Sequence, residues 1–81
     1  MRIQVQCFGV TRRYVESDVI GIDLDEPATV ADALAQLASR SGEMATVLTQ
    51  CAVAIGDELV RRNHPLRAGD ELALLPPVAG G

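Results

Sequence analysis

The chain has 81 residues, enough for one small domain with a thin core and too few for a deep, self-contained active site. Its apolar fraction of 48% predicts a folded globule. A net charge of -4 and only two aromatic residues, Phe8 and Tyr14, argue against nucleic acid as a direct ligand. An acidic domain of this kind favours a basic protein surface as its partner.

Every basic residue is an arginine, so the chain offers no Schiff-base lysine, P-loop lysine or lysine acceptor. A general bias of composition toward arginine explains this pattern as well as selection does. The chain also lacks the G-x-x-x-x-G-K-[ST] and G-x-G-x-x-G motifs. We therefore expect it to bind no cofactor, and any use of ATP to belong to a partner.

The two cysteines, Cys7 and Cys51, have the spacing of neither a metal site nor a disulfide framework. The first residues lack the apolar core of a signal peptide, and no apolar run is long enough to span a membrane. We expect a cytoplasmic protein with no metal site and no membrane partner.

Two strands open the chain. Residues 3–8 alternate, with Ile3, Val5 and Cys7 on one side, and residues 19–24 alternate in the same way. Polar and charged residues between them predict a turn over residues 9–17. Pro27 closes the second strand because proline cannot continue a ladder of backbone hydrogen bonds.

A helix is predicted from Thr29, since Thr29 and Asp32 have the spacing of a capping box. Its buried stripe is expected to contain Val30, Leu34, Leu37 and Ala38, with Gly42 just past its end. Residues 43–50 predict a second short helix. Three further strands are expected at 52–55, 59–60 and 71–75, with an irregular segment at 61–68 between the last two.

The order of these elements predicts an α+β protein with a ubiquitin-like β-grasp roll over residues 1–75. In it the first and last strands lie side by side in a mixed sheet, and one main helix covers one face. Phe8, Ala73 and Leu75 would then form an apolar patch on the uncovered face, which is typical of a partner surface. Scattered surface apolar residues are the alternative, and we favour the patch because the end of the chain is its predicted neighbour.

Other clusters suggest less chemistry. His64 with Cys7 or Cys51 is a possible thiol–imidazole pair that no spacing supports, and a structural role for His64 is the better hypothesis. The acidic groups are expected in solvated turns, and the arginine pairs in solvated loops or as docking groups. These groups are Asp23, Asp25 and Glu26; Asp57 and Glu58; Asp70 and Glu71; Arg12 and Arg13; and Arg61 and Arg62.

The last six residues, Pro76-Pro77-Val78-Ala79-Gly80-Gly81, predict an extended tail. Two prolines stiffen its root, and two glycines allow its tip to pass where side chains do not fit. Fraying of a chain end is the alternative, but it does not explain this order of residues. Fully extended, the tail reaches at most about 20 Å.

This ending resembles the MoaD family, the small subunits of molybdopterin synthase, as do His64-Pro65-Leu66, Gly69-Asp70-Glu71-Leu72, Phe8-Gly9 and the helix start at Thr29. The resemblance implies that a MoeB-like enzyme adenylates the Gly81 carboxylate with ATP. A sulfur donor protein then converts it to a thiocarboxylate. The tail enters a MoaE-like large subunit, within a heterotetramer, and donates sulfur to cyclic pyranopterin monophosphate.

In this hypothesis the chain is not an enzyme on its own. Some family members carry aromatic residues where Leu74 and Leu75 stand, so the predicted patch has less ring area. A carrier for cysteine, thiamine thiazole or tRNA thiolation, of the CysO or ThiS type, is the second hypothesis. A modifier that is conjugated to other proteins is the third, and a stand-alone enzyme is the last.

Overall fold

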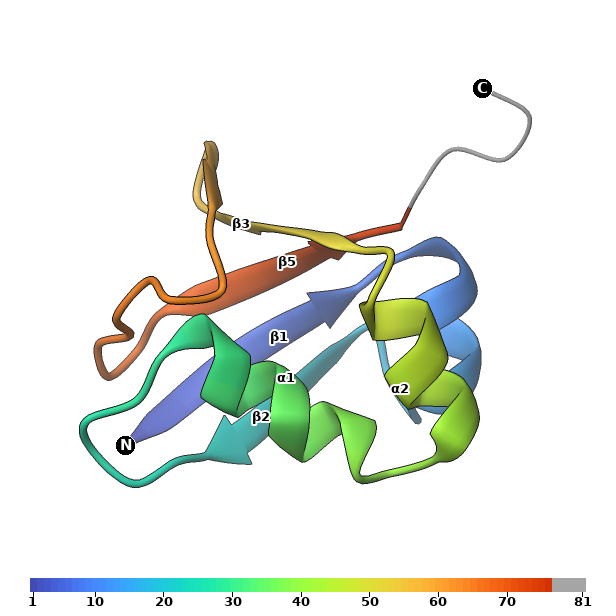
Figure 1. Ribbon diagram of the computed structural model, residues 1–81, viewed down its shortest axis with the longest axis horizontal. Helices are drawn as coiled ribbons and strands as arrows, with labels where there is room; N and C mark the ends of the chain where they lie inside the picture. Colours follow the sequence, from blue (N-terminus) through green and yellow to red (C-terminus); the bar gives the residue numbers. More distant parts are fainter. Residues whose placement is uncertain (77–81) are drawn as a thin grey trace.

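The computed structural model describes residues 1–76, which form one five-stranded mixed sheet with two α-helices on the same side of it (Figure 1). The strand order across the sheet is β2-β1-β5-β3-β4. In chain order the elements are β1 Arg2–Cys7, the 3-10 helix η1 Gly9–Tyr14, β2 Val19–Asp23, α1 Val30–Ala38, α2 Gly42–Leu48, β3 Ala52–Ile55, β4 Glu58–Val60 and β5 Glu71–Leu75.

The first and last strands are neighbours at the centre of the sheet. β1 pairs with β2 antiparallel, Val5 opposite Ile20, and with β5 parallel, Val5 opposite Leu72. β5 also pairs antiparallel with β3, which forms a hairpin with β4. This arrangement confirms the predicted α+β β-grasp roll.

The core lies between the sheet and the helices because alternate strand residues face the helical side. Ile3, Val5 and Cys7 are buried there, with Leu72 and Leu74 from β5. The helices contribute buried residues that their spacing predicts, namely Val30, Leu34, Leu37, Met44 and Leu48. Ala33 is buried in addition, and the predicted Ala38 and Val47 are only half-buried.

The predicted capping box at the start of α1 is confirmed. The backbone N–H of Thr29 donates to Asp32 Oδ2 at 2.8 Å, and Thr29 Oγ1 lies 3.2 Å from the same oxygen. These bonds satisfy polar groups that the first turn of a helix leaves without intrahelical partners.

The prediction for Gly42 is wrong. Gly42 is the first residue of α2, and α1 has already ended at Ala38. Ser41 is the N-cap of α2, since its Oγ accepts from the Met44 N–H at 3.0 Å. The second helix also ends at Leu48, two residues before the predicted end.

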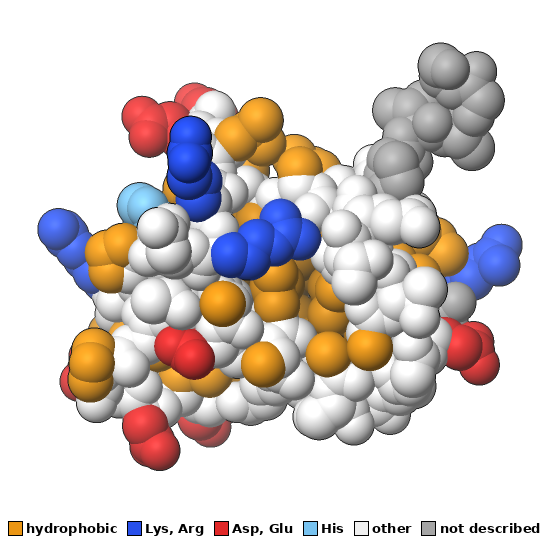
Figure 2. Space-filling model, in the orientation of Figure 1, with side chains coloured by type: hydrophobic (Ala, Val, Ile, Leu, Met, Phe, Trp, Pro, Cys, Tyr) orange, Lys and Arg blue, Asp and Glu red, His pale blue; other side chains and the backbone are white. Residues whose placement is uncertain are grey.

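Arg62 is exposed in the loop after β4, as expected, but it also makes contacts that the sequence does not predict. Its Nη2 donates to the carbonyl oxygens of Leu48, at 3.0 Å, and of Cys51, at 2.8 Å. Arg62 therefore satisfies carbonyls at the C-terminus of α2, where a cation is favourable. It lines a shallow apolar hollow between α1 and α2, and Figure 2 shows basic side chains over apolar groups on this face.

We expect Arg62→Ala to lower the free energy of unfolding by about 1–2 kcal/mol, because two carbonyls lose a charged donor and the Leu48 carbonyl keeps only the Cys51 N–H, at 3.3 Å. For a domain of this size that loss lowers the melting temperature by roughly 4–16 °C, which calorimetry would resolve. Arg61→Ala is the matched control and should stay within about 0.5 kcal/mol of the wild type. Equal effects of the two substitutions would contradict the capping role of Arg62.

Candidate functional site

The predicted tail begins at Pro76, which follows β5 directly and is half-buried. The other tail residues, Pro77, Val78, Ala79, Gly80 and Gly81, lie outside the described residues. The division between a domain at 1–75 and a tail at 76–81 therefore stays a prediction, as do the roles of the tail residues.

The uncovered face of the sheet carries exposed apolar side chains beside Pro76. Cys7 is opposite Leu74, so Phe8 and Leu75 come next to each other one position further along. Phe8 is 48% exposed and Leu75 is 38% exposed, while Ala73 is half-buried between β1 and β3. The structure thus brings together the three residues predicted for the patch, and their binding to a partner stays a prediction.

Leu59 extends this surface and was missed by the sequence reasoning. The register places Leu59 opposite Ala54 and Ala54 opposite Ala73, so all three lie on the uncovered face. Leu59 is 71% exposed, the largest fraction among the exposed large apolar residues of the described chain. We call Phe8, Leu59, Ala73 and Leu75 the open-face patch.

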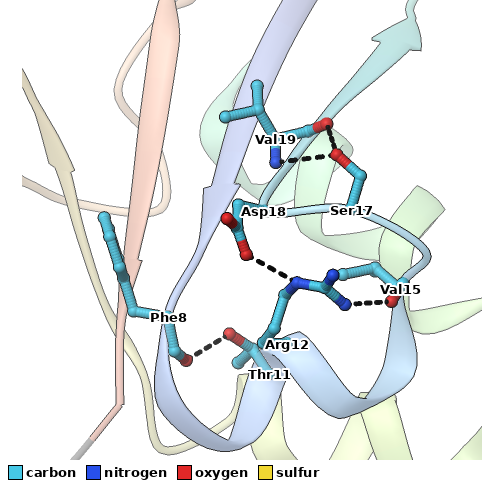
Figure 3. A network of polar contacts seen from close by, with 7 residues as sticks. All are labelled: Phe8, Thr11, Arg12, Val15, Ser17, Asp18 and Val19. Atoms are coloured by element: carbon cyan, nitrogen blue, oxygen red, sulfur yellow. Dashed lines mark hydrogen bonds and ion pairs between the residues drawn. The ribbon is translucent and has the colours of Figure 1, made fainter.

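The loop after Phe8 is more ordered than the predicted turn, because residues 9–14 form the 3-10 helix η1. Thr11 is fully buried, and its Oγ1 donates to the Phe8 carbonyl at 2.6 Å. Figure 3 shows Arg12 between Asp18 and Val15, with Nε donating to Asp18 Oδ1 at 2.6 Å and Nη1 to the Val15 carbonyl at 2.8 Å. Arg12 thus lies in a 3-10 helix, half-buried, and is less solvated than expected because it bonds to the chain that leads into β2.

Gly9, at the start of this loop, contacts the root of the tail. Its φ of +57° lies in the left-handed region, which favours glycine. A Cβ at Gly9 would lie 3.0 Å from Pro76 Cγ. Gly9 therefore allows the chain after Phe8 and the chain after Leu75 to pass close together.

The thiols and the imidazole have different environments. Cys7 and Cys51 are buried, and burial raises the pKa of both thiols, although Arg40 and Arg12 partly offset this at Cys7 and Arg62 does so at Cys51. His64 is exposed, and its backbone carbonyl accepts from the Val30 N–H at 3.0 Å. Buried thiols with raised pKa values are poor nucleophiles, so this arrangement favours structural roles.

The acidic groups are exposed or half-buried, but Glu58 and Glu71 are the first residues of β4 and β5, so the turns predicted for these two are wrong. Asp70 Oδ2 accepts from the Arg67 N–H at 2.8 Å, and Asp23 pairs with Arg2 at 2.9 Å. Among residues 1–76, no group of three or more His, Cys, Asp or Glu residues could hold a metal ion. In the same residues, no helix is long and apolar enough to cross a membrane.

Comparison with known proteins gives full-length relatives. The chain is 31% identical to the molybdopterin synthase sulfur carrier subunit of Chlamydomonas reinhardtii, over 100% of both chains. It is 36% identical to the subunit of the same name from Escherichia coli K12, over 98% of this chain and 99% of that one.

Solved structures have the same fold. The small archaeal modifier protein 1 of Haloferax volcanii superposes with a TM-score of 0.84 at 27% identity, over 95% of this chain and 98% of that one. A chain in the complex of subunits 1 and 2 of the molybdopterin-converting factor from Helicobacter pylori superposes with a TM-score of 0.71 at 30% identity, over 100% of both chains.

The ThiS family matches residues 5–81, nearly the whole sequence. The match includes the second half of β1, the other four strands, the two helices and the predicted tail. The chain therefore belongs to the ThiS family, with a ubiquitin-like β-grasp fold and full-length homology to molybdopterin synthase sulfur carrier subunits.

Proposed function

We propose that this chain is the sulfur carrier subunit of a molybdopterin synthase and carries sulfur as a thiocarboxylate on Gly81. The observation that supports this most is the full-length similarity to two carrier subunits, in a sequence that reads Gly80-Gly81 at its end. On its own the chain is then a donor and not an enzyme, and it works in the cytoplasm.

The proposed chemistry begins with a poor electrophile. A carboxylate resists nucleophiles because its charge is delocalised and its oxygen is a bad leaving group. A MoeB-like enzyme joins the Gly81 carboxylate to AMP from ATP with release of pyrophosphate. Sulfur at the oxidation level of sulfide, supplied by a donor protein, then attacks the acyl carbon, so that a C–S bond forms and AMP leaves. In the large subunit the resulting thiocarboxylate transfers its sulfur to cyclic pyranopterin monophosphate.

The open-face patch is the proposed docking surface for the partners. Exposed apolar side chains that lie close together mark a protein interface more often than isolated ones do. The Helicobacter pylori homologue was solved as a complex of subunits 1 and 2, which supports a large-subunit partner of the MoaE type. We propose the same pairing here, within a heterotetramer of two small and two large subunits.

A second candidate function is protein modification. The structural similarity to the small archaeal modifier protein 1 favours it, because a modifier also uses an activated terminal glycine. The two functions differ in the fate of the carboxyl group. A carrier exchanges oxygen for sulfur, whereas a modifier forms a stable amide with a lysine of another protein. Carriers for other sulfur pathways also exchange oxygen for sulfur, and they differ from a molybdopterin synthase subunit in the protein that receives the sulfur.

Deleting Gly80 and Gly81 should abolish thiocarboxylation while leaving thermal stability nearly unchanged, because the sheet ends at Leu75. Intact mass after incubation with a MoeB-like enzyme, ATP and a sulfur donor would measure the oxygen-to-sulfur exchange. The wild-type chain, treated in the same way, is the positive control. A large fall in melting temperature would count against a tail that acts only in delivery.

Phe8→Ala and Leu75→Ala should each weaken binding to a MoaE-like subunit about tenfold, as expected for apolar anchors near the centre of an interface. Gln36→Ala, on the exposed side of α1, is the control and should bind like the wild type. Calorimetric titration measures the affinities. Undiminished affinity of both patch variants would refute the docking surface, and absence of binding by the wild type would point to another sulfur pathway.

A further inference from the structure

The open-face patch and the root of the tail meet at one junction. Phe8 follows β1 and Leu75 ends β5, each one position beyond the paired residues Cys7 and Leu74. The next residue along each chain segment, Gly9 or Pro76, belongs to the close contact between those two. A change in that contact therefore moves the point where the chain leaves the sheet relative to the patch.

The loop side of this contact is held firmly. The Phe8 carbonyl accepts both the Thr11 hydroxyl, at 2.6 Å, and the Thr11 N–H, at 3.2 Å. The Cys7 N–H donates to the Asp18 carbonyl at 2.8 Å, and the Asp18 carboxylate holds Arg12 (Figure 3). Pro76 lies after the last residue of β5, so an added atom at Gly9 displaces Pro76 more readily than it displaces the loop.

We propose that Gly9 is a positioning residue that sets the exit of the tail relative to the open-face patch. In this role Gly9 acts through Pro76 and takes no part in the reaction itself. Its lack of a side chain lets Pro76 lie where a docked patch directs Gly81 to the activating site. This inference rests on the proposed function, because it assigns a residue to the delivery of the same carboxylate.

The chain contains a matched control for this role. Gly56 has nearly the same backbone conformation, with φ +62° against +57° at Gly9, but nothing lies within 4 Å of a Cβ built on it. Gly9→Ala and Gly56→Ala should therefore lose similar stability from the left-handed backbone. Only Gly9→Ala also pushes on Pro76.

The test is steady-state thiocarboxylation of each variant by a MoeB-like enzyme with ATP and a sulfur donor, followed by intact mass. We expect Gly9→Ala to lower kcat about three- to tenfold, since misplacement by a full ångström costs roughly 100-fold. KM should change less than about twofold because the patch itself is intact. Gly56→Ala should keep the wild-type kcat and KM.

Pro76→Ala removes the Cγ atom that a Cβ at position 9 would approach, and therefore serves as the rescue experiment. The double variant Gly9→Ala, Pro76→Ala should have the same kcat as Pro76→Ala alone. Equal losses of kcat in Gly9→Ala and Gly56→Ala, or a full Gly9→Ala effect in the Pro76→Ala background, would overturn the positioning role. Either result leaves the proposed function standing, because that function fails on wild-type behaviour, when the wild type gains no sulfur or does not bind a MoaE-like subunit.

A nuclear Overhauser effect between the Gly9 α-protons and the Pro76 ring protons tests the contact without any partner. We expect this signal in the isolated wild-type chain and its persistence in Gly56→Ala. Its absence from the wild type would overturn the positioning role whatever the kinetics show.

Discussion

β1 and β5 run side by side in the same direction at the centre of the sheet, although they are the first and last strands of the chain. This parallel pairing buries Val5 and Leu72 against the helices and places Phe8 beside Leu75 on the opposite face. The remaining strands extend the sheet from this pair, and α1 and α2 cover one side of it (Figure 1). The core and the open-face patch thus depend on the same set of backbone hydrogen bonds.

The two faces of the β1–β5 pair differ, because the helices cover one face and leave the other exposed. The helical side provides the hydrophobic burial that stabilises a small domain. The uncovered side keeps Phe8 and Leu75 exposed at some cost in solubility, which a partner surface would remove on binding. Cys7 and Cys51 are buried thiols with raised pKa values and His64 is exposed, so the chemistry proposed for this chain depends on its terminal carboxylate and on other proteins.

Features that depend on local spacing could be predicted from the sequence. The alternation of residues 3–7 indicated which side chains are buried, and Thr29 and Asp32 form the capping box that their spacing predicts. Features that depend on tertiary approach could not. Arg62 finds its carbonyl partners only when the loop at 61–68 folds against α2, and Leu59 lies in a three-residue strand, too short for a clear alternation. Gly42 was predicted just past the end of the first helix because glycine often follows a helix. It instead begins α2, because the preceding Ser41 caps the N-terminus of that helix.

The pairing of the first strand with the last also bears on protein synthesis. A ribosome makes β5 after every other strand, so a chain that is still emerging has Phe8 but no Leu75 beside it. The central pair closes the longest loop in the domain, and such non-local contacts form late and slowly. A partner that requires Phe8 and Leu75 together therefore binds only chains in which β5 has been made and has paired with β1. A chain whose synthesis stops before Leu75 cannot present the complete patch, whatever other parts of the fold it forms.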